Sequence, residues 1–325
     1  MALLEVKNLK VEFPNRHGTL HAINDISFSI DEGEVLGVVG ESGAGKSLTG
    51  AAIIGLLEPP GRIAGGEVWL EGERIDELDY VAMSRIRGAR IGAIFQDPLT
   101  SLNPLYTIGR QLTETIIVHS GMSQKAALNR AIELLAEVGI PAPAQRIEAY
   151  PHEFSGGMRQ RVVIALALCA NPSLIIADEP TTALDVSIQA QIIALLKRLC
   201  RDHGTAVMLI THDMGVIAET ADRVAVMYAG RIAEIGPVRE VIKHAQHPYT
   251  SGLMNSIPIL GHDTERLSQI KGAMPRLNEI PNGCAFSPRC PQALDRCFTE
   301  RPDLMATKQS GQAACWLYEE GADNG

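Results

Sequence analysis

The sequence lacks any run of about 18 consecutive apolar residues, the minimum for a helix that crosses a membrane. Residues 1–5 also lack a basic stretch followed by an apolar one, so we expect no secretory signal. Internal repeats, low-complexity tracts and long heptad runs are absent too. Together these absences predict a globular chain without a spanning segment.

An excess of basic charge is also absent. The chain has 29 Lys and Arg against 38 Asp and Glu, a formal net charge of -9. Broad binding to nucleic acid needs Lys and Arg to neutralise phosphates, so we expect no nucleic-acid partner, although a local basic patch stays open.

What the chain does have is enough apolar material for a sizeable core. It contains 325 residues, of which 46% are hydrophobic and 21% charged. This composition excludes a disordered chain. The length favours two domains, or one large domain with an extension.

One glycine-rich stretch matches the phosphate-loop pattern G-x-x-x-x-G-K-[ST] at every position. The apolar run 35–39 before it predicts a buried strand, and 48–57 after it predicts a helix. Backbone N–H groups and the helix dipole would then converge on an anion. Lys46 would reach the outer phosphates and the Ser47 hydroxyl would hold Mg²⁺. The predicted nucleotide-binding residues here are Gly40, Glu41, Ser42, Gly43, Ala44, Gly45, Lys46, Ser47 and Leu48.

Periodicity along the chain predicts an α/β fold. Loose alternation over 3–13 favours an edge strand. Helical spacing appears within residues 97 to about 165, which predicts a helical insertion. Strand-like runs that alternate with a helix at 186–202 are typical of a parallel sheet. The other expected strands are 23–30, 65–73, 91–96, 174–177, 205–210 and 223–228, and the insertion has helices at 108–118 and 124–138.

Two carboxylates end the apolar strand at 174–177. Asp178 would belong to the Mg²⁺ shell and Glu179 would polarise the attacking water, because hydrolysis of a phosphoanhydride depends on positioning and charge neutralisation. A solvated acidic turn is the alternative, and the phosphate loop upstream argues against it.

A second glycine motif, Ser155-Gly156-Gly157-Met158, precedes the apolar helix 162–170. It predicts another anion-binding helix start, which would serve the nucleotide of a neighbouring subunit. A serine N-cap beside a flexible turn is the simpler alternative.

With these motifs in order, residues 3–236 resemble the ATP-binding-cassette ATPases. The resemblance implies a RecA-like phosphate-loop core with an antiparallel β subdomain and a helical subdomain. Met158 departs from the family, which more often has Gln there. By resemblance, Phe13 stacks on adenine, Gln96 contacts Mg²⁺ and the attacking water, and His212 holds the γ-phosphate and helps position Glu179. Residues Ser155, Gly156, Gly157 and Asp185, which ends Ala183-Leu184-Asp185, face the opposing subunit.

Further motifs are similar to the ATPase subunits of dipeptide and oligopeptide importers. They are Phe95-Gln96-Asp97-Pro98-Leu99-Thr100-Ser101-Leu102-Asn103-Pro104, His247-Pro248-Tyr249-Thr250, Asn282-Gly283-Cys284 and Pro288-Arg289-Cys290-Pro291. This resemblance covers nearly the whole chain. It implies a second ATPase subunit, identical or paralogous, two membrane permeases and a solute-binding protein. The same group also imports nickel, opines and glutathione.

The tail 237–325 holds Cys284, Cys290, Cys297 and Cys315, separated by five, six and 17 residues. Paired CxxC knuckles are absent, so a zinc ribbon fits poorly, and disulfides are disfavoured in the cytosol. Some members of the peptide-importer group carry a four-iron four-sulfur (4Fe–4S) cluster on such a pattern. Zinc and free cysteines stay open as alternatives. Cys169 and Cys200 lie in apolar helices and are expected in the core.

The predicted protein is a peripheral subunit at the cytoplasmic face of the inner membrane that hydrolyses ATP for peptide import. Residues 1–236 would form the nucleotide-binding domain and 237–325 a Cys-containing C-terminal extension. A soluble cassette ATPase acting on nucleic acid or ribosomes is a rival, as is a regulatory module that binds ATP without hydrolysis. The single cassette and the negative charge argue against the first, and Glu179 with His212 against the second.

Overall fold

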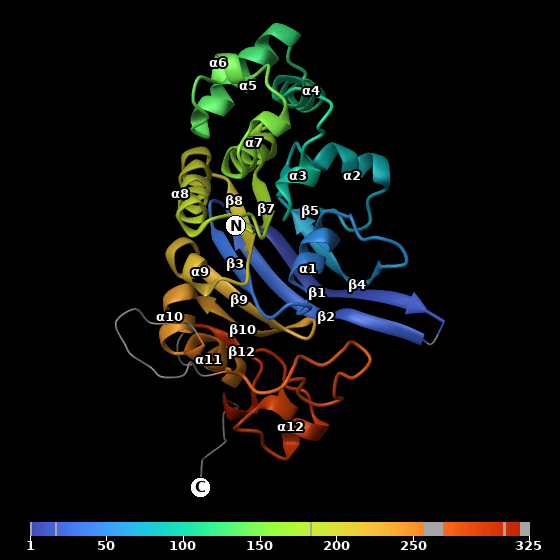
Figure 1. Cartoon of the computed structure of the whole chain (residues 1–325). Coiled ribbons are helices and arrows are strands. Elements are labelled where there is room, and N and C mark those ends of the chain that lie inside the picture. Colours follow the sequence, from blue (N-terminus) through green and yellow to red (C-terminus); the bar gives the residue numbers. More distant parts are fainter. Residues whose placement is uncertain (1, 17, 183, 257–268, 308–309, 319–325) are drawn as a thin grey trace. The chain divides into compact units, whose positions relative to one another are not determined.

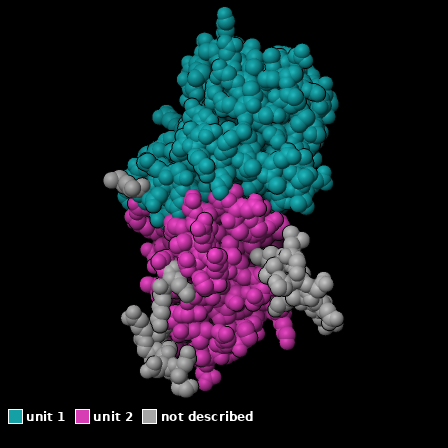
Figure 2. Space-filling view, turned by 90° about the vertical axis from the view of Figure 1, so that its left-hand side faces the viewer, with its two compact units in different colours: residues 1–4, 29–35, 69–210 teal, residues 5–28, 36–68, 211–325 magenta. Residues whose placement is uncertain are grey.

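The computed structural model describes residues 2–16, 18–182, 184–256, 269–307 and 310–318. The chain forms two compact units, each assembled from separate stretches of sequence (Figure 2). The first contains residues 1–4, 29–35 and 69–210, and the second contains residues 5–28, 36–68 and 211–325.

The first unit contains a parallel sheet in the order β8 (Ala206–Ile210), β7 (Leu174–Asp178) and β6 (Ile91–Ile94). These strands consist mostly of buried apolar residues, as strands covered on both faces do. Helix α8 (Val186–His203) connects β7 to β8 and ends at Gly204, whose φ of 68° suits glycine. The predicted parallel α/β core is confirmed.

The helical part of the first unit follows β6 and precedes β7 in chain order, and α4 (Ile108–Ser120), α5 (Gln124–Glu137) and α6 (Pro143–Arg146) of this part lie together in Figure 1. Two amphipathic helices of this part bury Leu112 and Ile116 from one and Leu134 and Leu135 from the other. Thr107 and Ser123 cap their starts, which sharpens the boundaries predicted from periodicity. The other helices of this unit before α8 are α2 (Tyr80–Ile86), α3 (Pro98–Ser101), the 3-10 turn η1 (Pro151–Glu153) and α7 (Gly156–Leu168).

An antiparallel sheet has the order β2 (Gly18–Asp31), β1 (Ala2–Asn15), β4 (Arg62–Leu70) and β5 (Glu73–Arg74). The prediction that residues 3–13 form an edge strand was wrong, because β1 lies between β2 and β4. Alternation of apolar and polar residues indicates that one face of a strand is buried, but it does not indicate how many strands pair with it.

A further part of the sheet structure includes β3 (Val35–Val39), the strand that leads into the phosphate loop. Strand β9 (Arg223–Tyr228) pairs with β3 in parallel, and β10 (Arg231–Pro237) pairs with β9 in antiparallel. The extension then adds β12 (Gln312–Ala313) to β10. The remaining elements are α1 (Lys46–Ile53), α9 (Met214–Thr220), α10 (Val238–Lys243), α11 (Pro248–Asn255), η2 (Ser287–Arg289), α12 (Arg296–Thr299), β11 (Met305–Ala306) and η3 (Trp316–Tyr318).

No helix in the described ranges combines the length and the apolar content needed to cross a membrane. Cys169 and Cys200 are both buried, at the end of α7 and within α8, as expected of core residues. Burial raises the pKa of Cys169 to about 11 and that of Cys200 to about 12, so both thiols stay protonated and unreactive.

Candidate nucleotide-binding site

The phosphate loop is held in a shape that requires glycine. Gly40 has a φ of 152°, and a Cβ atom there would lie 2.3 Å from the carbonyl oxygen of Met227. Gly45 has a φ of 103° at the N-cap of α1, where a Cβ would meet Ile23 at 2.6 Å. The loop therefore leads directly into a helix N-terminus whose N–H groups have no side-chain cap, as a phosphate site needs.

Lys46, at the first position of α1, turns back into the loop. Its ammonium donates to the carbonyl oxygens of Gly40 at 2.8 Å and Glu41 at 3.1 Å, and the residue is only 6% exposed. Ser47 is exposed beside it and Leu48 is half-buried. A desolvated cation beside a helix start provides strong positive potential, so the loop is suited to an anion.

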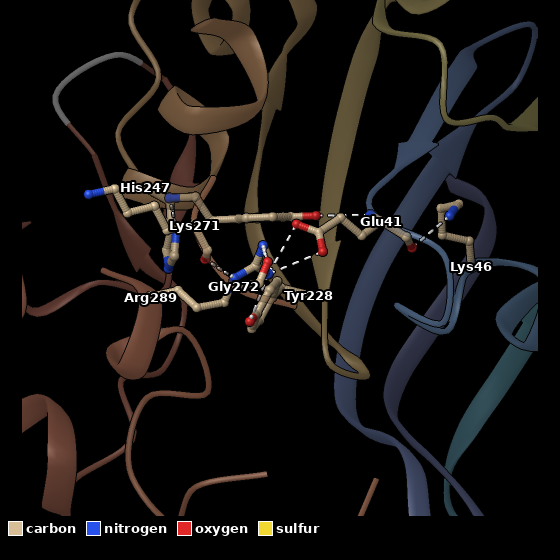
Figure 3. A network of polar contacts seen from close by, with 8 residues as sticks. Glu41, Lys46, Tyr228, His247, Lys271, Gly272 and Arg289 are labelled. Atoms are coloured by element: carbon tan, nitrogen blue, oxygen red, sulfur yellow. Dashed lines mark hydrogen bonds and ion pairs between the residues drawn. The ribbon is translucent and has the colours of Figure 1, made fainter. Parts of the chain in front are cut away.

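Glu41 connects the loop to the C-terminal extension, a contact that the motif analysis missed. Its N–H donates to the hydroxyl of Tyr249 at 2.9 Å, and its carboxylate forms an ion pair with Arg289 at 3.1 Å (Figure 3). Both partners belong to the motifs His247-Pro248-Tyr249-Thr250 and Pro288-Arg289-Cys290-Pro291. Those motifs were the available signal, but nothing in the sequence specified what they contact.

His247 starts α11, which carries Tyr249. The imidazole Nδ1 of His247 accepts from the backbone N–H of Tyr249 at 3.0 Å. The backbone N–H of His247 donates to the Glu234 carboxylate at 2.9 Å. Burial lowers the pKa of His247 to about 4, so the imidazole is neutral, as an acceptor must be. Burial raises the pKa of Glu234, whose carboxylate also accepts from the Gln246 N–H.

This neutral histidine predicts acid sensitivity. Between the ordinary pKa of about 6.5 and the folded value of about 4, the unfolded chain binds a proton that the folded chain does not. The contribution of neutral His247 to the unfolding free energy should therefore be fully present above about pH 6.5 and decrease as the pH falls. His247→Asn keeps an N-cap acceptor but does not titrate. Between about pH 7.5 and pH 5.0 the wild type should lose about 1–2 kcal/mol more unfolding free energy than the variant in urea denaturation. Equal losses would contradict the assignment.

In the first unit, Glu179 follows β7 in a left-handed conformation with a φ of 46°, which is uncommon for a residue with a side chain. Its N–H donates to the carbonyl oxygen of Ile210, which fixes the backbone. Its carboxylate accepts from Gln96 Nε2 at 3.1 Å and from the Thr182 hydroxyl at 2.8 Å. The structure therefore brings the predicted pair Gln96 and Glu179 together, and adds Thr182, which the sequence did not indicate. Asp178, the last residue of β7, is half-buried.

The second glycine motif begins α7. Ser155 is exposed and caps the helix by accepting from the Met158 N–H at 3.4 Å. A Cβ on Gly157 would lie 2.8 Å from the Ile188 side chain, so glycine permits close packing on α8. Asp185, the N-cap of α8, is exposed and makes no side-chain cap. These predicted residues thus form one exposed region of the first unit, while Ala183 lies outside the described residues.

The remaining predicted residues lie in the second unit. The ring of Phe13 packs on Gly61, where a Cβ would meet its Cε1 at 2.6 Å. His212 follows β8 and is exposed, directly before Asp213, the N-cap of α9. Phe13 itself is half-buried.

The four cysteines of the extension come near one another. The backbone N–H of Cys284 donates to the Cys297 carbonyl at 2.8 Å. Burial raises the pKa of Cys315 to about 12, and charges on the other three contribute to the shift. Burial also raises the pKa values of Cys284 and Cys290. However, no group of three or more His, Cys, Asp or Glu side chains among the described residues has a metal-binding arrangement. The predicted 4Fe–4S cluster is therefore not supported by the structure.

A strand, a glycine loop and a helix start around a buried lysine define a nucleotide-binding protein of the phosphate-loop class. Comparison with known proteins narrows this class. Residues 23–182 match the family described as "ABC transporter", and residues 233–297 match "Oligopeptide/dipeptide transporter, C-terminal region".

Relatives that align with nearly the whole chain include two named peptide-transport proteins. The oligopeptide transport ATP-binding protein AppD of Bacillus subtilis is 47% identical, over 98% of this chain and 97% of its own length. The dipeptide transport ATP-binding protein DppD of Escherichia coli is 46% identical, over 97% of this chain and 96% of its own length.

Solved structures agree on the fold. The dimeric ATP-binding cassette MJ0796, in a post-hydrolysis state with ADP and Pi, is 30% identical with a TM-score of 0.65, over 73% of this chain and 99% of that one. The cbiO1 protein of Clostridium perfringens is 28% identical with a TM-score of 0.65, over 75% of this chain and 91% of that one. The chain belongs to the ATP-binding-cassette (ABC) transporter family and is an ATPase of that family.

Proposed function

We propose that this chain is the ATP-hydrolysing subunit of an importer of dipeptides or oligopeptides. The observation that carries the proposal is the near full-length similarity to named peptide-transport ATP-binding proteins, which extends through the C-terminal region. Import of nickel, opines or glutathione by the same machinery is the alternative. The proposed domains are the nucleotide-binding domain, 1–236, and the extension, 237–325.

Within this function we assign roles to the predicted residues. The loop amides and Lys46 bind the phosphates of ATP, and the glycine cradle described above fits them. Ser47, Gln96 and Asp178 offer oxygen atoms, the donors that Mg²⁺ prefers, and the ion would neutralise phosphate charge. Glu179 accepts a proton from the attacking water, with Gln96 holding its carboxylate. Phe13 stacks on adenine, and His212 holds the γ-phosphate.

We further propose that two ATPase subunits complete each other's sites. Ser155 and Asp185 are exposed, so both side chains can contact a second subunit. The dimeric state of the related MJ0796 cassette supports this arrangement. A strictly monomeric chain that hydrolyses ATP at the full rate of the complex would contradict it.

The proposed partners are a second ATPase subunit, two permeases and, through them, a solute-binding protein. The chain would be bound to the cytoplasmic face of the membrane through the permeases. Affinity purification of the tagged chain from cells tests this directly. We expect permease subunits in the membrane fraction, whereas recovery with ribosomes or DNA would favour the rival soluble ATPase.

A 4Fe–4S cluster on Cys284, Cys290, Cys297 and Cys315 is retained as a hypothesis because the extension holds all four, and the Cys284 N–H donates to the Cys297 carbonyl at 2.8 Å. It would be structural or regulatory, because these cysteines lie outside the ATP motifs. Anaerobic purification should give brown protein with absorbance near ~400 nm and stoichiometric iron. Cys315→Ser should lose both signals and Cys169→Ala should keep them. Colourless, iron-free wild-type protein would exclude the cluster.

A further inference from the structure

The C-terminal extension lies directly against the phosphate loop, within the second unit. Glu41 occupies an unspecified position of the glycine motif, yet two residues of the extension bind it (Figure 3). Met274 adds an apolar contact, because a Cβ on Gly43 would meet its Cε at 3.1 Å. The loop's surroundings therefore include a segment distant in sequence from the motif.

Tyr249 fixes the backbone of the loop. Its buried hydroxyl accepts from the Glu41 N–H at 2.9 Å, and this N–H belongs to the peptide whose carbonyl, on Gly40, accepts from Lys46. The Tyr249 ring packs against Tyr228 and Phe286, with centroids 4.6 and 5.4 Å away. A rigid aromatic cluster thus sets the orientation of the peptide that positions Lys46.

Arg289 fixes the side chain of Glu41. Its guanidinium is 7% exposed and donates to the carbonyl oxygens of Lys271 at 2.9 Å and Gly272 at 3.2 Å. The same group donates to the hydroxyl of Tyr228 at 3.3 Å and to Glu41 at 3.1 Å. A buried guanidinium must be paired, because an uncompensated charge is costly, so Glu41 has a fixed partner.

We propose that Arg289 and Tyr249 are positioning residues that hold the phosphate loop in its nucleotide-binding shape. This inference rests on the proposed ATP-binding role of the loop, and it assigns the extension a function inside the ATP site. A loop that is already ordered loses less conformational entropy when it binds phosphate, so the contacts act on affinity. Both residues act on Glu41 of the phosphate loop, so we expect them to change ATP binding and not the rate of the chemical step.

The test measures Mg·ATP affinity and steady-state ATPase kinetics of the full-length chain in its complex. Arg289→Gln and Tyr249→Phe should each raise the Kd and KM for ATP about fivefold, with kcat within about twofold of wild type. Arg289→Lys should recover part of the loss. Glu41→Gln should raise the Kd for ATP as Arg289→Gln does. The double variant Glu41→Gln/Arg289→Gln should bind ATP no more weakly than either single variant, since both substitutions remove the same interaction.

Arg301→Gln is the matched control. Arg301 donates to the carbonyl oxygens of Gly283 at 3.2 Å and Pro281 at 2.9 Å, entirely within the extension. Arg301→Gln should lower the thermal stability of the chain as much as Arg289→Gln does, but it should leave the Kd for ATP unchanged.

Wild-type ATP affinity in Arg289→Gln would overturn the inference. So would an equal loss of affinity in Arg301→Gln, or additive losses in the Glu41 and Arg289 double variant, because the extension would then act only as general support. The readout is ATP binding, so these outcomes are independent of whether the transported substrate is a peptide.

Discussion

Replacing Glu179 with glutamine should reduce ATP hydrolysis by the assembled complex by roughly 100-fold or more, while ATP still binds. Glutamine keeps the size of the side chain and can still pair with Gln96 and Thr182, but it cannot take a proton from water. The left-handed backbone at Glu179 is fixed by its bond to Ile210, so the substitution should not move the chain.

Phosphate release and nucleotide binding, measured on the same preparation, separate the two properties. Glu148→Gln, an exposed glutamate in the same unit, is the control and should hydrolyse ATP like wild type. Near wild-type hydrolysis by Glu179→Gln would show that another group accepts the proton.

Replacing Lys46 with alanine should weaken Mg·ATP binding by about 100-fold, which corresponds to about 3 kcal/mol for lost hydrogen bonds between charged groups. The buried Lys46 ammonium donates to the carbonyl oxygens of Gly40 and Glu41. The same group therefore holds the loop in shape and supplies a positive charge for the phosphates. Alanine removes both effects while leaving the helix start intact, because alanine favours helices.

Equilibrium binding of a fluorescent ATP analogue measures this loss directly. Lys125→Ala, at an exposed position of α5, should bind the analogue with wild-type affinity. If Lys46→Ala bound it as tightly as wild type, the glycine loop would not be the phosphate site. Thermal melting of both variants separates lost affinity from lost folding.

The sequence predicted those elements whose cause is local. Strand β3, the glycine loop and α1 follow from a run of apolar residues, a fixed glycine spacing and a helix-forming segment. α8 was predicted to within a residue, and in the structure Gly204 ends it. By contrast, α1 is shorter than the predicted helix 48–57, since Gly55 with a φ of 63° follows its C-cap.

What the sequence could not predict depends on contacts between distant residues. β1 looked like an edge strand because alternation describes one face and says nothing of the partners at its sides. Similarly, Tyr249 and Arg289 stood in recognisable motifs, but only the folded chain brings both to Glu41. The resemblance to peptide-importer ATPases suggested a cluster on the four cysteines, but no group of three or more metal-ligating side chains is found among the described residues.

The most direct test of the central claim is uptake of a labelled peptide into proteoliposomes that hold Mg·ATP and carry this chain with its permeases. With the solute-binding protein outside, wild-type complex should accumulate the peptide, and the Glu179→Gln complex should accumulate none above background. Peptide uptake that persists without Glu179, or a wild-type complex that transports nickel, opines or glutathione but no peptide, would contradict the account.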